Sequence, residues 1–265
     1  MASILLFDSG IGGLSIQHHI TQRLPELTIH YLADNQRFPY GELSEPQLIN
    51  GCVSLIQRFL AEHDISLVVI ACNSASTLVL AALRQQISVP VVGVVPAVKP
   101  AAQLTTNKVV GLLATPGTIQ RQYTNELIKA HASDCEVLRI GTSELVQLAE
   151  CKLSGQTVNR QQLQQILMPF IHARTMPDTI VLGCTHFPLL ADELTAVLGE
   201  QVQLVDSGVA VARRVEDQLP TTMAVNSSTV ASKTNQFFYT GSAPNVALQQ
   251  QLQKLGFSQC RLFNA

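Results

Sequence analysis

The chain has 265 residues, of which 46% are hydrophobic and 14% are charged. This length allows one large domain or two ordinary ones, each with its own buried core. The net charge of −2 provides no basic surface for binding nucleic acid, and no uncharged apolar run reaches the roughly 18 residues of a spanning helix, so neither a nucleic-acid nor a membrane partner is expected.

The first residues, Met1 to Asp8, have the pattern of a strand and not of a signal sequence, because no basic segment and no long apolar segment precede Asp8. A cytoplasmic protein is therefore expected. Thiols stay reduced in that compartment, so the cysteines are not expected to form a disulfide framework. They contain no C-x-x-C pair, and no metal site is predicted from their spacing.

Short apolar runs alternate with longer stretches of helical pattern along the chain. The runs are continuous, which is typical of parallel strands buried on both faces. Strands are predicted at Ile4–Phe7, Ile29–Ala33, Leu67–Ala71, Val89–Val95, Val109–Leu113, Val137–Ile140, Ile180–Leu182, Val202–Val205 and Gln236–Thr240. Helices are predicted at Leu48–Glu62, Ser76–Gln86, Ile119–Ala132 and Arg160–Ala173. The alternation predicts an α/β fold of mostly parallel sheets flanked by helices.

An internal repeat divides this pattern into two related halves. The loop at Phe7–Gly10 has a counterpart at Ala114–Gly117, and Ile70–Asn73 has a counterpart at Leu182–Thr185 at a similar spacing. Two pseudosymmetric lobes are therefore predicted, one from residues 1–97 plus 206–265 and one from 98–205. Ligands of open α/β sheets bind beyond the carboxyl ends of the strands, so the active site is expected in the cleft between the lobes.

The first loop that carries chemistry surrounds Cys72. It follows a buried strand and precedes a helix, where backbone N–H groups favour an anion and lower the pKa of a thiol. Asn73, Ser74 and Ser76 add neutral donors that can hold a carboxylate. A buried structural cysteine beside a helix-capping serine is the alternative.

The second loop repeats this design around Cys184. Thr185 offers a hydroxyl, and His186 lies close enough in sequence to orient the thiol or to exchange a proton with it. Glu150 is a lone carboxylate on the apolar helical stretch at Leu145–Ala149. The remaining cysteines lack a strand-end loop of small residues, and they are interpreted as packing residues: Cys52, Cys135, Cys151 and Cys260.

Three further loops are candidates for substrate binding. The glycine loop after the first strand begins with Asp8 and Ser9, and it departs from a dinucleotide fingerprint because Ser15 replaces the third glycine. Asp8 is expected beside the Cys72 loop as an acid or base, with capping of the next helix as the alternative. The other two loops contain Tyr40 and Gly41 in a turn and the hydroxyls of Thr115 and Thr118.

Two thiols at matched positions suit inversion of an α-carbon, which needs a proton removed from one face and returned to the other. A thiol has an ordinary pKa of about 8.5, so both protonation states are accessible near neutral pH. Carbanion character at the α-carbon must be stabilised by directed donors. These loops contain no lysine for a pyridoxal Schiff base, and no cofactor is predicted.

These motifs together resemble those of the glutamate racemases, in the aspartate/glutamate racemase superfamily. The resemblance runs in order through the segments at 7–13, 39–41, 71–76 and 183–189 and extends to 237–241. It implies an isomerase that needs no cofactor and converts L-glutamate to D-glutamate for peptidoglycan synthesis, cell wall biogenesis and cell shape. Members are often dimeric, so a homodimer is expected.

The resemblance also implies roles for single residues. Cys72 and Cys184 would be the catalytic pair, with Cys72 acting on D-glutamate and Cys184 on L-glutamate. Supporting acid/base residues would be Asp8, Glu150 and His186. Substrate-binding residues would be Asp8, Ser9, Tyr40, Gly41, Asn73, Ser74, Thr185 and His186.

Three alternatives remain at this point. One is a racemase of another amino acid, such as aspartate, because the motifs are shared across the superfamily. Another is a thiol hydrolase that uses Cys184 and His186 and gives Cys72 no role. The last is a two-lobed binding protein, which needs donors but has no use for two matched thiols.

Overall fold

A computed structural model describes residues 2–219 and 234–264 and divides the chain into two compact units. Unit 1 contains Met1–Val94 and Gly208–Ala265, and unit 2 contains Val95–Ser207. The sequence placed the corresponding boundaries after residues 97 and 205. Among the described helices, none combines the length and the apolar character that a membrane crossing needs.

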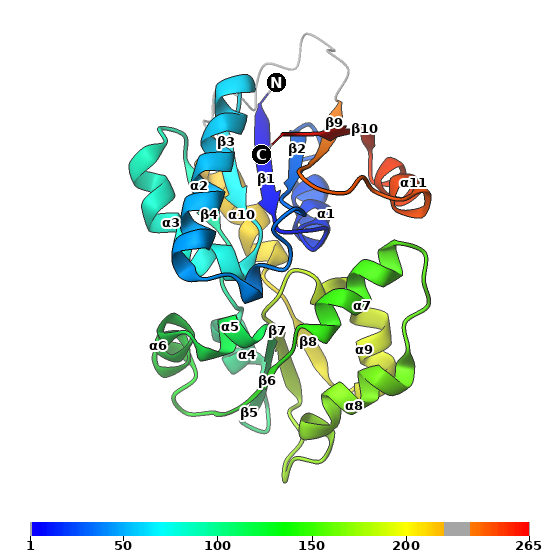
Figure 1. Ribbon diagram of the computed structural model, residues 1–265. Helices are drawn as coiled ribbons and strands as arrows, with labels where there is room; N and C mark the ends of the chain where they lie inside the picture. Colours follow the sequence, from blue (N-terminus) through cyan, green and yellow to red (C-terminus); the bar gives the residue numbers. More distant parts are fainter. Residues whose placement is uncertain (1, 220–233, 265) are drawn as a thin grey trace. The chain divides into compact units, whose positions relative to one another are not determined.

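Unit 1 is built on a six-stranded sheet in which every pairing is parallel (Figure 1). Its strands are β1 (Ser3–Asp8), β2 (Thr28–Ala33), β3 (Leu67–Ile70), β4 (Val91–Gly93), β9 (Asn235–Tyr239) and β10 (Phe257–Leu262). The strand order is β10-β9-β2-β1-β3-β4. The two central strands are therefore β2 and β1, and β9 and β10 extend the edge beside β2. The C-terminal segment joins this sheet, because β9 pairs with β2.

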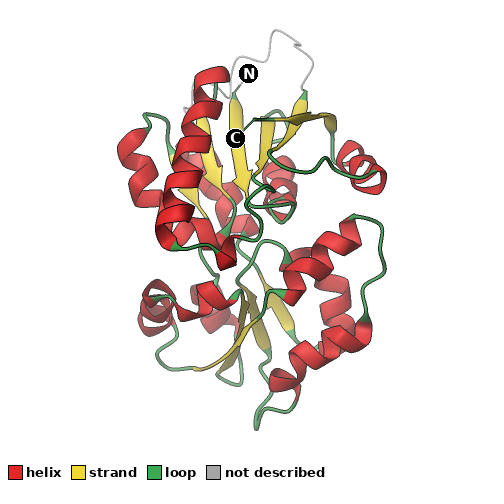
Figure 2. Cartoon of the chain, in the orientation of Figure 1, coloured by secondary structure: helices red, strands yellow, loops and turns green. Residues whose placement is uncertain are grey.

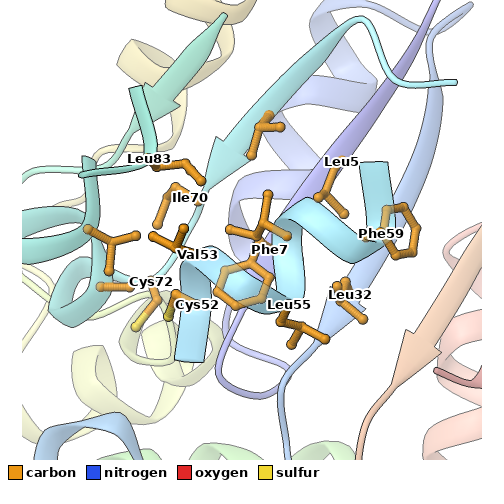
Figure 3. Close-up of a cluster of buried hydrophobic side chains, with 14 of the residues drawn as sticks. Leu5, Phe7, Leu32, Cys52, Val53, Leu55, Phe59, Ile70, Cys72 and Leu83 are labelled. Atoms are coloured by element: carbon orange, nitrogen blue, oxygen red, sulfur yellow. The ribbon is translucent and has the colours of Figure 1, made fainter. Parts of the chain in front are cut away.

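Helices cover both faces of this sheet. They are α1 (Leu14–Arg23), α2 (Glu45–Glu62), α3 (Asn73–Gln86), α10 (Gly208–Gln218) and α11 (Val246–Lys254), with a short 3-10 turn, η1 (Tyr40–Glu42). Figures 1 and 2 show α2 and α3 on one face and α1 and α10 on the other. The core between the sheet, α2 and α3 includes Phe7, Ile70 and Phe59, and Cys52 and Cys72 lie at one end of it (Figure 3).

Unit 2 has a smaller sheet, again with every pairing parallel. Its strands are β5 (Val109–Ala114), β6 (Glu136–Gly141), β7 (Thr179–Leu182) and β8 (Gln203–Val205). Its helices are α4 (Val98–Leu104), α5 (Pro116–Gln120), α6 (Gln122–His131), α7 (Glu144–Leu153), α8 (Arg160–Ile171) and α9 (Ala191–Leu198), with a 3-10 turn, η2 (Phe187–Leu190). Central strands β5 and β7 are buried along their whole length, as their continuous apolar runs predict.

The two sheets share one topology. Unit 2 has the order β6-β5-β7-β8, and the first four strands of unit 1 have the equivalent order β2-β1-β3-β4. Cys72 follows β3 and Cys184 follows β7, which are equivalent strands. The predicted α/β fold with two related halves and parallel sheets flanked by helices is therefore confirmed.

One predicted helix is divided in the structure. The segment expected as a single helix over 119–132 forms α5 and α6, because Arg121 adopts an extended backbone with φ −68° and ψ 141° between them. Thr115 precedes α5, and Pro116 occupies its first turn, where a missing N–H does no harm. The first of these helices therefore begins immediately after the strand-end loop that contains Thr115.

Asp178 joins the loop before β5 to the start of β7 through a set of hydrogen bonds. The hydroxyls of Thr105 and Thr106 each donate to its carboxylate over 2.7 Å. The backbone N–H groups of Thr106 and Asn107 donate over 2.8 and 2.9 Å. Partial burial alone would raise the pKa of Asp178, but the hydrogen bonds from these residues hold it well below its usual range.

We expect Asp178→Asn to lower the free energy of unfolding by about 1–2 kcal/mol at pH 7, because the partly exposed carboxylate loses charge-assisted hydrogen bonds that solvent screens in part. A carboxyl with a depressed pKa stabilises the fold above its unfolded pKa of about 3.9 and loses this effect as the pH falls further. Urea unfolding should therefore show a difference from wild type at pH 7 that narrows below about pH 4.

Asp134→Asn is the matched control for this measurement. Its carboxylate pairs with Lys108 at 2.7 Å, but both side chains are more than half exposed. Exposed pairs of this kind contribute little to stability, so no resolvable change is expected. Equal stability of wild type and Asp178→Asn at pH 7 would contradict the role assigned to Asp178.

Candidate active site

Cys72 lies at the junction of β3 and α3 in unit 1. The residue is 6% exposed and occupies the position that caps the N-terminus of α3. The β1 and β3 strands are neighbours in the sheet, with Phe7 paired to Ile70. The loops that follow these strands therefore meet at the same edge, and the Ser9 Oγ lies 3.9 Å from the Cys72 Sγ. The expectation that Asp8 and Cys72 belong to adjacent strand-end loops is confirmed.

Asp8 ends β1 and is fully buried. Its Oδ1 accepts hydrogen bonds from the Gly10 N–H at 3.0 Å and from the Ser9 Oγ at 3.4 Å. The alternative in which Asp8 caps the next helix is wrong, because Gly13 precedes α1 at the capping position. A Cβ on Gly13 would lie 2.8 Å from the Tyr31 Oη, so glycine permits this loop to pack closely over the sheet.

The residues after Cys72 form the first turn of α3, and Asn73 and Ser74 are each 4% exposed. The Asn73 Nδ2 is buried and has no hydrogen-bond partner among the described residues. A buried amide nitrogen without an acceptor is costly, so this atom is suited to donate to an oxygen of a bound molecule. Ser76 is not a capping residue: its hydroxyl donates to the Ile70 carbonyl at 2.8 Å and accepts from the Val94 N–H at 2.9 Å, which fixes the turn.

Tyr40 and Gly41 open the 3-10 turn η1, and they differ in exposure. Gly41 is exposed, whereas Tyr40 is 2% exposed and its phenol points into the core of unit 1. The Tyr40 Oη donates to the Asp34 carboxylate. The Cys52 Sγ lies 3.4 Å from the Tyr40 Oη. The sequence did not single out Asp34, although it directly follows β2 and so lies at the sheet edge where Asp8 also lies. The phenol is thus engaged with the protein, whereas the turn is exposed at Gly41.

In unit 2, Cys184 and His186 follow β7, and Glu150 reaches them from α7. The Cys184 Sγ lies 3.9 Å from the His186 Nδ1, and the His186 Nε2 lies 2.7 Å from a Glu150 carboxylate oxygen. Cys184 is 7% exposed and His186 is 2% exposed. The histidine therefore connects a thiol on one side with a carboxylate on the other, an arrangement that can hold or move a proton.

The charge of this group depends on its surroundings. Burial alone would lower the pKa of His186, but its hydrogen bonds with Cys184 and Glu150 and the negative charge of Glu150 raise it well above its usual value. A protonated His186 places a positive charge 3.9 Å from the Cys184 Sγ. The lone glutamate that the sequence placed on an apolar helix is thus a direct partner of the histidine.

The hydroxyl loop of unit 2 lies at the neighbouring strand end. β5 pairs with β7, and the hydroxyl oxygen of Thr115, directly after β5, lies 3.0 Å from that of Thr118 in α5. Thr185 follows Cys184 and is 4% exposed. A Cβ on Gly183 would lie 3.0 Å from the Ala114 Cβ, so glycine lets the two strand ends approach each other.

The predicted site residues are thus divided between the two units. The group in unit 1 contains Asp8, Ser9, Tyr40, Gly41, Cys72, Asn73 and Ser74. The group in unit 2 contains Thr115, Thr118, Glu150, Cys184, Thr185 and His186. Of the other cysteines, Cys52 is buried, and desolvation is the main cause that raises the pKa of its thiol to about 12. It stays a neutral thiol near pH 7. Cys135, Cys151 and Cys260 are half-buried.

Comparison with known proteins identifies the family. A model of the Asp/Glu/Hydantoin racemase family matches residues 15–215. The glutamate racemase of Pectobacterium carotovorum subsp. carotovorum (strain PC1) is 56% identical over 212 residues, which are 80% of this chain and 74% of the relative. The glutamate racemase of Shewanella sp. (strain MR-7) is 50% identical over 258 residues, which are 96% of this chain and 94% of the relative.

The fold of this chain also matches that of a solved glutamate racemase. The crystal structure of Escherichia coli glutamate racemase, in complex with L-glutamate and the activator UDP-MurNAc-Ala, matches with a TM-score of 0.92 and 44% sequence identity. The match covers 99% of this chain and 98% of that one. The chain therefore belongs to the Asp/Glu/Hydantoin racemase family, and within that family to the glutamate racemases.

Proposed function

We propose that the chain interconverts L- and D-glutamate through the thiols of Cys72 and Cys184, without a cofactor. The observation that carries this proposal is the pair of buried cysteines at equivalent strand ends in two sheets of the same strand order. Each cysteine has its own polar surroundings, with Asp8 and Ser9 near Cys72 and His186 and Glu150 near Cys184. Neither a thiol hydrolase nor a binding protein accounts for both thiols.

The chemistry requires one thiol at each face of the bound α-carbon. From L-glutamate, the Cys184 thiolate would take the α-proton and the Cys72 thiol would give its proton to the opposite face. D-glutamate then leaves a protonated Cys184 and a Cys72 thiolate, which is the state that the reverse reaction needs. Protonated His186 would support the Cys184 thiolate, and Asp8 would act as a supporting acid or base near Cys72.

Substrate binding is assigned to neutral donors in both units. The unpartnered Asn73 amide nitrogen and the Ser9, Ser74 and Thr185 hydroxyls are buried donors suited to carboxylate oxygens. The backbone of Tyr40 and Gly41 would add to them, and Thr115 and Thr118 would supply hydroxyls in unit 2. A supply of D-glutamate for peptidoglycan synthesis and a homodimer remain predictions from the family resemblance, and a cytoplasmic location remains a prediction from the sequence pattern.

Incubation of the purified protein with L-glutamate in D2O tests this function. We expect D-glutamate to form, with deuterium at the α-carbon of the product, and chiral chromatography with mass spectrometry measures both. L-Aspartate in the same assay is the control for substrate choice, because aspartate lacks one methylene. Formation of D-aspartate but not of D-glutamate would overturn the proposed substrate, and absence of both products would overturn the activity.

A further inference from the structure

Asp34 is a buried carboxylate that the proposed chemistry does not use. It directly follows β2, and it is fully buried. Its Oδ2 accepts a hydrogen bond from the Arg37 Nε at 2.7 Å and another from the Tyr40 phenol. Its Oδ1 accepts one from the Thr240 hydroxyl at 2.9 Å. An ionised carboxylate is costly to bury unless it is paired and hydrogen-bonded, and here its partners come from separate segments of unit 1.

The backbone of Asp34 is also hydrogen-bonded to the end of β1, where the loop that contains Ser9 begins. Its N–H donates to the Asp8 carbonyl at 2.8 Å, which extends the pairing of β1 with β2 by one residue. Asp34 thus contacts the residue that ends β1 with its backbone and the Tyr40 turn with its side chain. One residue therefore links two of the loops to which we assign substrate binding.

The residues at the C-terminal end of β9 make further hydrogen bonds with the loop that follows β2. The Thr240 hydroxyl, which donates to Asp34, also accepts from the Gln36 N–H at 3.1 Å. The Asn35 Oδ1 accepts from the backbone N–H groups of Thr240 and Gly241 at 3.0 and 2.7 Å. A Cβ on Gly241 would lie 2.9 Å from the Gln36 backbone nitrogen, so only glycine allows this approach without a backbone shift.

The Tyr40 phenol stays neutral within this network. Burial is the main cause that raises its pKa well above the usual value, and the charge of Asp34 adds to the effect. A neutral phenol can donate to the carboxylate, and a phenolate cannot. The Tyr40 side chain is thus an anchor that fastens its own turn to Asp34.

We propose that Asp34 and Thr240 are positioning residues, which hold the Tyr40–Gly41 turn so that its backbone faces the substrate. The inference rests on the proposed function, since it assigns a purpose to a turn that would bind glutamate. A buried charge that joins β2, the turn and the end of β9 fixes the place of the turn more narrowly than apolar packing does. These residues would act on substrate binding and not on proton transfer.

Thr240→Val, with Thr240→Ser as its matched control, tests the proposal with little change of side-chain size. Valine removes the hydroxyl, and serine keeps it. We expect KM for L-glutamate to rise about 5- to 10-fold in Thr240→Val, with kcat within about 2-fold of wild type. The reason is that a less well positioned turn weakens binding of the ground state and of the transition state equally. Thr240→Ser should restore a KM near that of wild type.

A second pair of variants shows whether Asp34 acts through the turn. Asp34→Asn and Tyr40→Phe should each raise KM, and the double variant should raise it by less than the product of the single effects, because both substitutions act on the hydrogen bond between these two side chains. Asn159→Ala controls for lost stability alone: its side chain caps α8 in unit 2, so the melting temperature should fall and KM should not change.

The outcomes separate this inference from the proposed function. A wild-type protein without glutamate turnover removes the proposed function, whatever the variants do. Wild-type turnover with a KM in Thr240→Val equal to that of wild type would overturn the positioning role alone. If Asp34→Asn does not fold, the Thr240 pair still decides the question, since neither of its members introduces or removes a charge.

Discussion

Replacement of either Cys72 or Cys184 by serine should abolish the interconversion of the glutamate enantiomers. A hydroxyl is too weak an acid to become the required base, and general acid–base catalysis by a positioned group contributes about 10²- to 10⁴-fold. We therefore expect kcat/KM to fall by at least that factor in each variant. Chiral chromatography of reactions started from each enantiomer measures the loss.

Exchange of the α-hydrogen separates the roles of the two thiols. Each variant retains one cysteine, which can still remove the α-proton from the enantiomer that faces it. We expect Cys72→Ser to exchange deuterium into L-glutamate without inversion, and Cys184→Ser to exchange it into D-glutamate. Cys135→Ser, a half-buried cysteine in unit 2, is the control and should behave as wild type. Wild-type turnover in either active-site variant would refute the two-thiol mechanism.

Glu150→Gln should lower the pKa of His186. The carboxylate lies 2.7 Å from the His186 Nε2, and its hydrogen bond and negative charge favour the protonated imidazole. The amide of glutamine carries no charge, so this contribution to the pKa of His186 is lost. Titration of the imidazole nitrogens by NMR measures it. We also expect kcat to fall about 10- to 100-fold, because a less basic histidine supports the Cys184 thiolate less well.

The pH dependence of stability provides a second measurement on the same variant. The pKa of His186 is raised in the folded protein, so its pairing stabilises the fold fully below the unfolded value of about 6.5 and ceases to do so as the pH rises through the folded value. The difference in unfolding free energy between wild type and Glu150→Gln should therefore be largest near pH 6 and shrink at alkaline pH.

Glu193→Gln is the control for both measurements. Its carboxylate lies 2.8 Å from Lys152, on the helix that also carries Glu150, so the substitution removes a neighbouring negative charge without touching the histidine. The pKa of His186 should stay near the wild-type value. An equal shift in Glu150→Gln and Glu193→Gln would show that general electrostatics, and not the hydrogen bond, sets this pKa.

The parts of the fold that were predictable from sequence are those with a strong local pattern. The central strands are continuous β-branched and apolar runs, because helices cover both faces of each sheet. β10 was missed because it is an edge strand: Phe257 is buried, whereas most of the later residues to Leu262 are exposed, so no apolar run exists. Several helices of seven to eleven residues were not among those named from the sequence, since few turns give a weak periodicity: α1, α4, α9, α10 and α11.

The candidate site was predictable to a similar degree. The repeat at Cys72 and Cys184 indicated both loops, and the structure adds the contact of Glu150 with His186 across a long stretch of chain. The orientation of Tyr40 was not predictable, because it depends on Asp34, and Asp34 in turn depends on Thr240, which is distant in sequence. Such long-range pairings leave no local pattern in the residues that make them.

The path of the chain through unit 1 has a consequence for synthesis on the ribosome. Unit 2 is one continuous segment, so all of its strands have been made once residue 207 has left the tunnel. Unit 1 must wait, because β2 keeps an open edge until β9 arrives to cover it. Synthesis of unit 1 thus begins first, but its sheet is completed last. The hydrogen bond from Thr240 to Asp34 can form only after residue 240 has left the ribosome.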